Sequence, residues 1–322
     1  MAKQKVFCTR KIPEEGLSLL SEQFDLKVWQ GKLPPTREEL LENSRDCHAL
    51  LSLLSDRIDE DFLNNCPNLK VISNYAVGYN NIDVEAADKR NIKVGNTPDV
   101  LTDATADIAA ALLFSCARLI QPAIINAKQG EWKTWEPLGF IGKDLRNKTL
   151  GVVGAGRIGF SFAKAMHFGF NMNVIYFSRT KNEKFENELN ASQVSLEEIA
   201  SNSDFISLHC PLNENTKNLI NEEFFSKTKS HAILINTARG EIIDQNALVN
   251  ALKSKKLFAA GLDVTSPEPL PKNHELFNLD NCIVLPHIGS ATEQARIKMS
   301  LICAENITKG LNGQKLPHEV LK

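Results

Sequence analysis

Short apolar runs alternate with amphipathic stretches over about the first 95 residues of the chain. Strands that alternate with helices in this way require a parallel sheet covered by helices. The apolar runs predict strands at Lys5–Cys8, Leu26–Trp29, Ala49–Leu53, Lys70–Asn74 and Lys93–Val94. The amphipathic stretches predict helices at Pro13–Ser21, Arg37–Asn43, Glu60–Asn65 and Asp83–Lys89.

A second alternating unit begins at Thr149. Its apolar runs predict strands at 150–153, 173–177, 204–208, 232–236, 259–263 and 282–285. The final helix, at Ala291–Gly310, is expected to return to the first unit. The pattern therefore predicts an α/β protein with two doubly wound parallel-sheet domains. Residues 1–100 plus 291–322 form one domain, and residues 101–290 form the other.

The two units are joined by an Ala-rich helix at Thr102–Leu119 and then by a segment with little periodicity, from Gln121 to Arg146. This segment carries Trp132 and Trp135 but has no core of its own. Such a long segment is usually either mobile or packed against a partner. We therefore expect a dimerisation arm at about residues 121–146 and a homodimer.

The second unit opens with a glycine pattern, G-x-G-x-x-G, in which Gly154, Gly156 and Gly159 join a buried strand to an amphipathic helix at Arg157–Phe168. Gly154 allows a tight turn, Gly156 lets the backbone approach a pyrophosphate, and Gly159 lets the helix pack close to the strand. The pattern by itself also occurs in ordinary glycine-rich turns. Its place between a strand and a helix favours dinucleotide binding.

The end of the next strand differs from the usual NAD-binding pattern. An acidic residue there would bind the ribose 2′-hydroxyl of NAD. This chain has Ser178, Arg179, Thr180 and Lys181 instead. A guanidinium beside hydroxyls suits a 2′-phosphate, so the sequence predicts NADP(H). The alternative is a solvated polar turn.

Composition narrows the class of protein further. The 322 residues are 43% hydrophobic and 24% charged, with a net charge of −2, which disfavours nucleic acid and anionic membranes as partners. No apolar run approaches the roughly 20 residues that span a bilayer. The seven cysteines and seven histidines are scattered without metal-ligand spacing, so we expect reduced thiols, no metal and a cytoplasmic protein. The early first strand leaves no room for a signal peptide.

Three strands of the second unit are followed by segments with reactive side chains, and these carry Arg239, Glu268 and His287. Ligands of parallel sheets bind beyond the carboxyl ends of strands. Arg239 can clamp a carboxylate, and His287 can give a proton to a carbonyl oxygen. Glu268 would stabilise the imidazolium if it bonds the far ring nitrogen. Each residue alone is more often structural, but the set suits hydride transfer to a 2-oxo acid.

Over essentially its whole length the chain resembles the D-isomer-specific 2-hydroxyacid dehydrogenases, and within them the reductase branch. The segments that carry the resemblance are Val77–Gly78, Val94–Asp103, Gly154–Gly159, Thr237–Gly240, Ala259–Pro271 and Leu285–Thr292. The resemblance implies a Rossmann-type nucleotide domain and a flavodoxin-like substrate domain. It also implies NADPH-dependent reduction of glyoxylate to glycolate and of hydroxypyruvate to D-glycerate.

The resemblance also assigns roles to individual residues. The catalytic arginine, glutamate and histidine are Arg239, Glu268 and His287. The substrate, a small 2-oxo acid lying between the two domains, is expected to contact Val77, Gly78, Arg239, His287, Ser290 and, from a second subunit, Trp135. The cofactor is expected to contact Gly154, Gly156, Arg157, Ile158, Gly159, Ser178, Arg179, Thr180, Pro211, Thr237, Asp263 and Gly289.

Two other functions remain open from the sequence. One is another D-2-hydroxyacid dehydrogenase, of lactate or of phosphoglycerate; the chain ends at Lys322 without the regulatory domain of many phosphoglycerate dehydrogenases, which lowers the weight of that substrate. The other is a dinucleotide-sensing interaction protein similar to a corepressor. The turn at Ser178 and Arg179 argues against it.

Overall fold

The computed structural model describes residues 3–320 and divides into two compact units. Unit 1 comprises the residues up to Leu101 and those from Ser290 onward, and unit 2 comprises Thr102–Gly289. Each boundary lies one residue from the position expected from the sequence. Both units are described below separately.

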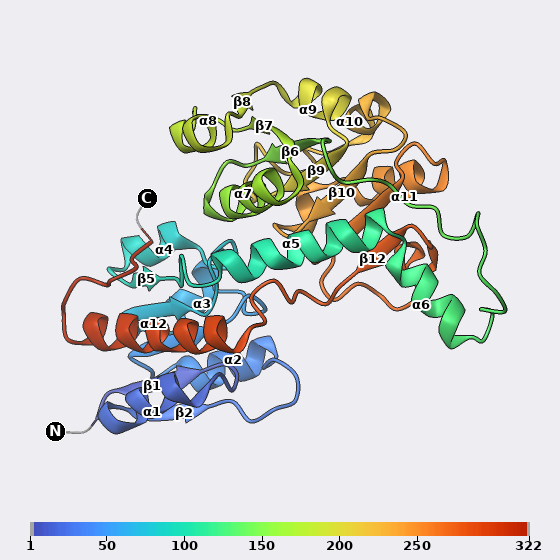
Figure 1. Cartoon of the computed structure of the whole chain (residues 1–322). Coiled ribbons are helices and arrows are strands. Elements are labelled where there is room, and N and C mark those ends of the chain that lie inside the picture. The colour runs from blue at the N-terminus through green and yellow to red at the C-terminus, as the bar shows by residue number, and fades with distance from the viewer. Residues whose placement is uncertain (1–2, 321–322) are drawn as a thin grey trace. The chain divides into compact units, whose positions relative to one another are not determined.

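Unit 1 is built on a five-stranded sheet with the order β2-β1-β3-β4-β5 (Figure 1). Every strand pair in it is parallel, and the order is that of flavodoxin-like doubly wound sheets. Because the order reverses beside β1, loops from both halves meet beyond the carboxyl ends of the strands. The strands are β1 (Lys5–Cys8), β2 (Asp25–Val28), β3 (Ala49–Ser52), β4 (Val71–Asn74) and β5 (Lys93–Gly95).

Helices cover both faces of this sheet. Neighbouring strand residues point to opposite faces, so Ile72 packs with α2, α3 and α4 whereas Val71 meets Gly310 of α12. α12 also lies along α1, where a Cβ on Gly16 would come within 2.4 Å of the Ser300 carbonyl oxygen. The helices are α1 (Glu14–Gln23), α2 (Arg37–Ser44), α3 (Glu60–Asn64), α4 (Val84–Lys89) and α12 (Glu293–Leu311).

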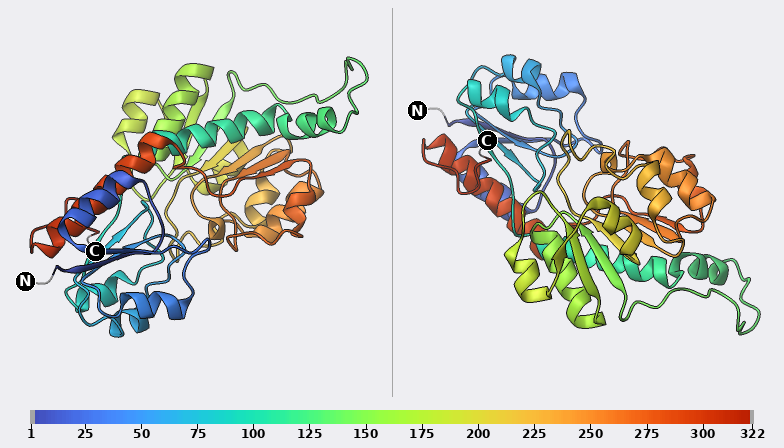
Figure 2. Two further views of the ribbon diagram at one scale, coloured as in Figure 1. Left: turned by 90° about the horizontal axis from the view of Figure 1, so that it is seen from below. Right: turned by 90° about the horizontal axis from the view of Figure 1, so that it is seen from above.

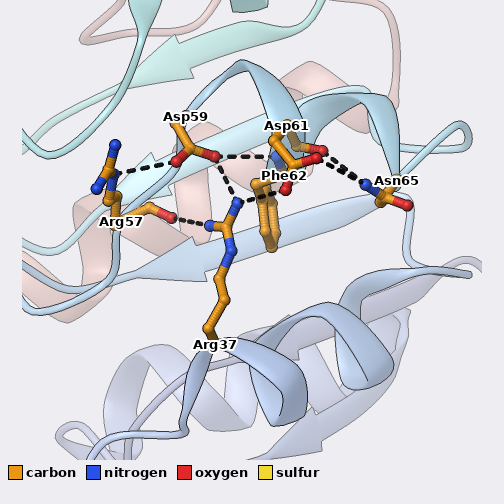
Figure 3. A network of polar contacts seen from close by, with 6 residues as sticks. All are labelled: Arg37, Arg57, Asp59, Asp61, Phe62 and Asn65. Atoms are coloured by element: carbon orange, nitrogen blue, oxygen red, sulfur yellow. Dashed lines mark hydrogen bonds and ion pairs between the residues drawn. The ribbon is translucent and has the colours of Figure 1, made fainter.

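An ion-pair network fixes the connection between α2 and α3 (Figure 3). The Arg37 guanidinium donates to Asp59 at 2.5 Å, to Asp61 at 3.1 Å and to the Arg57 carbonyl oxygen at 2.7 Å. Asp59 also caps α3, because its carboxylate accepts from the Phe62 N–H at 3.0 Å. The network therefore ties the start of two helices to the loop that leaves β3.

Unit 2 is built on a seven-stranded sheet with the order β12-β11-β10-β9-β6-β7-β8, again parallel throughout. The order reverses between β6 and β9, and in sheets of this kind ligands bind beside that switch point. The strands are β6 (Thr149–Val153), β7 (Asn173–Phe177), β8 (Ser192–Gln193), β9 (Phe205–Leu208), β10 (Ile233–Asn236), β11 (Ala259–Leu262) and β12 (Cys282–Val284).

Two apolar clusters, one on each face of this sheet, form the core of unit 2. One joins the strands to α5, α7 and α8, and the other joins them to α9, α10 and α11. The helices are α5 (Thr102–Ala117), α6 (Ile120–Lys128), α7 (Arg157–Phe170), α8 (Glu183–Leu189), α9 (Leu196–Asn202), α10 (Glu222–Lys227) and α11 (Gln245–Lys253), with short 3-10 turns η1 (Gly240–Ile242) and η2 (Glu275–Asn278).

The segment expected to lack periodic structure is partly helical. α5 stops where Leu119 adopts a left-handed backbone with φ of 51°, and α6 then occupies Ile120–Lys128. None of the α6 residues is buried, so the helix has no apolar stripe facing this unit. From residue 129 to 148 the chain runs as an irregular arm that projects beyond α6 (Figure 2).

The predicted fold class, two doubly wound parallel-sheet α/β domains, is confirmed by both sheets. Among the helices of residues 3–320, none is alone long and apolar enough to cross a membrane. Only α5 and α6 taken together pass by length and composition, and the two are bent by 65° relative to each other.

Candidate active site

The glycine turn after β6 has the geometry that its sequence predicts. Gly154 has a φ of 102°, and a Cβ there would lie 2.4 Å from the Cys210 backbone nitrogen. A Cβ on Gly159 would lie 2.5 Å from the Gly154 carbonyl oxygen. Gly156 differs from both, because a Cβ there would meet nothing within 4 Å. Packing therefore requires two of the glycines, and the third faces open space.

The helix that follows this turn begins without a side-chain cap. Gly156 occupies the N-cap position, so no side chain accepts from the first turn of α7, which carries Arg157 and Ile158. An uncapped helix start beside open space fits the pyrophosphate of a dinucleotide. Asn182, which the sequence did not indicate, donates from Nδ2 to the Ala155 carbonyl oxygen at 2.7 Å and holds the turn from the far side.

The end of β7 presents hydroxyls and a cation. Arg179 and Thr180 are exposed, and Ser178 is half-buried and donates to the Thr180 carbonyl oxygen. Gln193 donates from Nε2 to the Ser178 carbonyl oxygen at 2.7 Å, which fixes the turn to β8. Within residues 3–320 the Arg179 side chain makes no hydrogen bond or ion pair, unlike Lys181, which pairs with a glutamate at 2.7 Å.

On the other side of the switch point, β9 is followed by His209, which no sequence motif indicated. His209 Nε2 shares a hydrogen bond with Ser207 at 2.8 Å, and its Nδ1 lies 3.5 Å from the Thr237 hydroxyl. Burial lowers the pKa of His209 to about 3, so the ring stays neutral. It links the glycine turn to buried Thr237, while Pro211 stands exposed two residues further on.

Arg239 lies in a tight turn after β10. Buried Asn236 shapes the turn, because its Nδ2 donates to the Arg239 carbonyl oxygen at 2.8 Å and its Oδ1 accepts from the Ala238 N–H at 3.0 Å. A Cβ on Gly240 would lie 2.0 Å from the Thr265 carbonyl carbon, so only glycine lets this turn approach the next loop. Burial lowers the pKa of Arg239, opposed by the negative charge of Glu268.

Glu268 sits in that next loop, after β11, and uses both carboxylate oxygens. Oε1 accepts from the Thr265 N–H at 3.0 Å, and Oε2 lies 2.9 Å from His287 Nδ1. Gln245 of α11 holds the loop through paired bonds to the Ser266 backbone, at 2.7 and 3.1 Å. Burial opposes ionisation of Glu268, but the bond with His287 and the nearby charges outweigh it and lower its pKa.

His287, after β12, has a left-handed backbone with φ of 54°, which is unfavourable for an L-residue that carries a Cβ and is found at functional sites. Buried Asp263 holds this conformation, because its two oxygens accept from the Ile288 and Gly289 N–H groups at 2.7 Å each. Burial raises the pKa of Asp263, and these two bonds counteract the rise. Thr105 of α5 adds a bond of 3.2 Å to the Gly289 carbonyl oxygen.

Unit 2 therefore brings together the expected arginine, glutamate and histidine, with Asp263, Thr237 and the glycine turn along the same carboxyl edge of its sheet. Val77, Gly78 and Ser290 belong to unit 1, where Val77 and Gly78 lie half-buried in the loop after β4. Trp135 lies on the arm and is 80% exposed. The described residues contain no group of His, Cys, Asp and Glu that could hold a metal ion.

The functional residues that the sequence did not indicate are mainly amides: Asn182, Asn236 and Gln245. Each bonds a backbone group of the loop that carries an expected site residue. Asn236 could have been suspected, because it ends a buried strand just before Arg239. The partners of Asn182 and Gln245 are 27 and 21 residues away in the chain, and no local pattern indicates them.

This arrangement can donate a proton beside a bound anion. His287 Nδ1 is engaged by Glu268, so Nε2 is the nitrogen left to act on another molecule. A carboxylate behind an imidazole fixes the ring and stabilises its protonated form. Arg239 adds a half-buried positive charge close to the same glutamate.

Comparison with known proteins agrees with this chemistry. Residues 110–289 match the family described as D-isomer specific 2-hydroxyacid dehydrogenase, NAD binding domain. The chain is 47% identical to a glyoxylate reductase of Thermococcus litoralis, over 99% of this chain and 97% of that one. It is 44% identical to human glyoxylate reductase/hydroxypyruvate reductase, over 98% of this chain and 97% of the human one.

A solved structure of another reductase is also similar to this chain. The NADPH-dependent glyoxylate/hydroxypyruvate reductase of Sinorhizobium meliloti, in complex with NADP and malonate, aligns with a TM-score of 0.86 and 29% identity, over 99% of this chain and 97% of that one. These similarities extend over both units, with the site residues in unit 2 lying inside the matched family region. The chain therefore belongs to the D-isomer-specific 2-hydroxyacid dehydrogenase family of oxidoreductases.

Proposed function

We propose that this enzyme reduces glyoxylate to glycolate and hydroxypyruvate to D-glycerate, with NADPH as the preferred reductant. The observation that carries the proposal is the 2.9 Å contact between Glu268 and His287, with Arg239 beside the same carboxylate. The names of its relatives, glyoxylate reductase and glyoxylate reductase/hydroxypyruvate reductase, support the choice of substrates.

The nicotinamide, when bound, supplies the hydride that reaches the carbonyl carbon of the substrate. Protonated His287 gives the Nε2 proton to the carbonyl oxygen, which yields the 2-hydroxy acid. Glu268 keeps the ring in place through Nδ1 and balances its positive charge. Arg239 binds the substrate carboxylate through its planar guanidinium. The backbone N–H groups of Val77 and Gly78 provide the carboxylate site in unit 1.

Preference for NADPH follows from the turn after β7. No carboxylate stands at residues 178–182, and exposed Arg179 is available to a 2′-phosphate with Ser178 and Thr180 beside it. A guanidinium forms charge-assisted bonds with phosphate, whereas an acidic side chain would repel it. The glycine turn, Arg157, Ile158, Pro211, Thr237, Asp263 and Gly289 complete the cofactor site in this proposal.

We further propose a homodimer that uses the arm from about residue 121 to 146. Trp132, Trp135 and Leu138 are 74%, 80% and 82% exposed, and large apolar side chains gathered on one segment are typical of an interface. In this arrangement Trp135 reaches the substrate site of the second subunit. The dispersed, buried and unpaired cysteines support a cytoplasmic location for the enzyme.

The test follows the absorbance of NADPH with glyoxylate, hydroxypyruvate and pyruvate in parallel, and then repeats the assay with NADH. We expect kcat/KM for glyoxylate and hydroxypyruvate to exceed that for pyruvate, and NADPH to exceed NADH. Turnover of pyruvate alone would assign the enzyme to another D-2-hydroxyacid dehydrogenase reaction. Absence of turnover with all three acids would contradict the proposal.

A further inference from the structure

The loop after β4 in unit 1 is held through three consecutive carbonyl groups. The Ala76 carbonyl oxygen accepts from the Thr97 N–H at 2.9 Å. The Val77 carbonyl oxygen accepts from Asn96 Nδ2 at 2.8 Å, and the Gly78 carbonyl oxygen accepts from Asn74 Nδ2 at 2.8 Å. Each peptide unit from residue 76 to 79 therefore has its own anchor.

Anchoring a carbonyl also orients the next N–H, because the peptide unit is planar and its C=O and N–H point in opposite directions. The three anchors therefore fix the N–H groups of Val77, Gly78 and Tyr79, which point away from the groups that hold the carbonyl oxygens. In the part of the chain that the structure describes, none of these three N–H groups donates to a protein acceptor. Val77 and Gly78 are only half-buried, so a ligand can reach them.

The two asparagines are themselves fixed from several sides. Asn74 is fully buried, its Oδ1 lies 3.0 Å from the Ser52 hydroxyl, and its Nδ2 also lies 3.2 Å from Asn81 Oδ1. The backbone N–H of Asn96 donates to the His318 carbonyl oxygen at 3.1 Å, and its own carbonyl oxygen accepts from Asn306 at 3.2 Å. A carbonyl oxygen only accepts, so the side-chain atom facing it must be the NH₂ group.

We propose that Asn96 and Asn74 are positioning residues that hold the N–H groups of Gly78 and Tyr79 ready for the carboxylate of a 2-oxo acid, beside the Val77 N–H, which the Thr97 backbone orients through the Ala76 carbonyl oxygen. The inference rests on the proposed function, which gives Val77 and Gly78 to that carboxylate. Asparagine suits both positions because its amide donates without adding charge. An aspartate would place an acceptor against a carbonyl oxygen and a negative charge near the arriving carboxylate.

Asn96→Asp in the full-length enzyme tests this role, with Asn74→Asp as the companion variant. Because hydrogen bonds to charged groups are strong, we expect KM for glyoxylate to rise roughly 10- to 100-fold. kcat should change much less, and KM for NADPH should remain within about twofold. The glyoxylate KM of Asn96→Asp should recover as the pH is lowered towards about 5, since a protonated aspartate in a partly buried site again donates to the Val77 carbonyl oxygen.

Asn43→Asp is the matched control, because the Asn43 amide donates to the Glu39 carbonyl oxygen at 2.6 Å within α2 of the same unit. It makes the same chemical change without touching the loop, and should leave KM for glyoxylate unchanged at every pH. A merely structural role of Asn96 would lower the melting temperature and affect glyoxylate and NADPH alike. Asn96→Ala, which adds no charge, replaces any aspartate variant that does not fold.

Calorimetric binding of oxalate to the full-length enzyme separates this inference from the proposed function, since it needs no turnover. A wild-type enzyme that reduces no 2-oxo acid would contradict the proposed function. Weaker oxalate binding by Asn96→Asp than by Asn43→Asp would still support the positioning role of Asn96. Two results would overturn the inference: no oxalate binding by the wild type, or oxalate binding and glyoxylate KM within about twofold of wild type in a folded Asn96 variant.

Discussion

A single carboxylate determines which nitrogen of His287 can act. Glu268 Oε2 lies 2.9 Å from Nδ1, and the left-handed backbone of His287 is held by the two bonds that Asp263 accepts from the next two N–H groups. His287 is therefore held at its backbone and at Nδ1 of its ring. Fixed geometry of this kind reduces the reorganisation that a proton transfer requires. The residue-scale predictions concern this pair and Arg179, the exposed cation after β7.

His287→Ala should reduce kcat for glyoxylate by about 100- to 10,000-fold, because a positioned general acid contributes on that order. NADPH affinity should stay close to wild type, as measured by fluorescence titration. His231→Ala is the control, since His231 pairs with Asp204 at 2.9 Å and lies outside the proposed site. Retention of wild-type kcat by His287→Ala would contradict the proposed role.

Glu268→Gln should shift the alkaline limb of the kcat/KM profile for reduction to lower pH. Glu268 is ionised at neutral pH, because the bond with His287 and nearby charges outweigh burial and lower its pKa. Its negative charge favours the protonated ring that reduction needs, and glutamine removes that charge. Glu275→Gln, which loses only an exposed pair with Lys253, serves as the control. An unmoved alkaline limb would disprove the pairing.

Arg179→Ala should weaken NADPH binding by roughly 10- to 100-fold and NADH binding much less, because only NADPH carries the phosphate that a charged hydrogen bond would hold. Titration of both cofactors against the same variant measures the difference directly. Lys181→Ala, two residues away and engaged by Glu186 at 2.7 Å, provides the comparison. Equal affinity of the wild type for both cofactors would refute the charge argument.

At the scale of elements, ion pairs that also cap a helix should matter more than isolated ones. Burial opposes ionisation of Asp59, but bonds from the Phe62 N–H and from Arg37 outweigh it and lower its pKa. A carboxyl group whose pKa is lower in the folded than in the unfolded state stabilises the folded state. This stabilisation is complete above the unfolded-state pKa, near 4, and is lost as the pH falls through the folded-state pKa.

Arg37→Met should therefore reduce stability at pH 7 by about 1 kcal/mol, or a few degrees in the melting temperature. The difference from wild type should shrink between about pH 4 and pH 2, as Asp59 becomes protonated. Lys5→Met is the control, because Lys5 and Asp46 form a long, exposed pair of 3.9 Å and should contribute nothing measurable. Equal melting temperatures of Arg37→Met and wild type at pH 7 would contradict the prediction.

The same scale shows what the sequence could predict. Eleven strands were placed within about a residue or two, because most of them are short apolar runs, and some, such as Ala49–Ser52, are buried along their whole length. β8, the polar and exposed pair Ser192–Gln193, was not predicted. Gly154 and Gly159 were identified because close backbone approaches demand glycine at those points. The wrong part was Ile120–Lys128, which is helical although none of its residues is buried and its three isoleucines are 40% to 48% exposed.

Other features lay outside what local patterns can carry. α8 to α11 were not predicted. These helices are too short to be stable alone, and their stability comes from packing on strands that are distant in the sequence. In the sequence Asn182, Asn236 and Gln245 look like ordinary polar residues, because their hydrogen-bond partners are set by the fold. The left-handed backbone of His287 likewise depends on Asp263, which is 24 residues earlier in the chain.

At the scale of the whole molecule, the arm is the feature that one chain alone does not explain. Residues 129–148 contain no helix or strand, and Trp132, Trp135, Leu138 and Ile141 are between 63% and 82% exposed. Aromatic and aliphatic side chains of this size usually bury themselves in a neighbouring surface. The alternative is that the arm packs on its own subunit, which its exposure here disfavours.

The enzyme should therefore sediment at twice the 35.8 kDa mass of the chain. Trp135→Ala should lower the hydroxypyruvate-to-pyruvate ratio of kcat/KM by more than it changes NADPH affinity, because in this proposal the indole shapes the second subunit's pocket for a hydroxymethyl group. Leu33→Ala, a change at a side chain that is 76% exposed in unit 1, should alter neither mass nor ratio. A monomeric wild type, or an unchanged ratio in a Trp135→Ala variant that remains dimeric, would contradict the proposal, because either result would leave the second subunit without a part in the site.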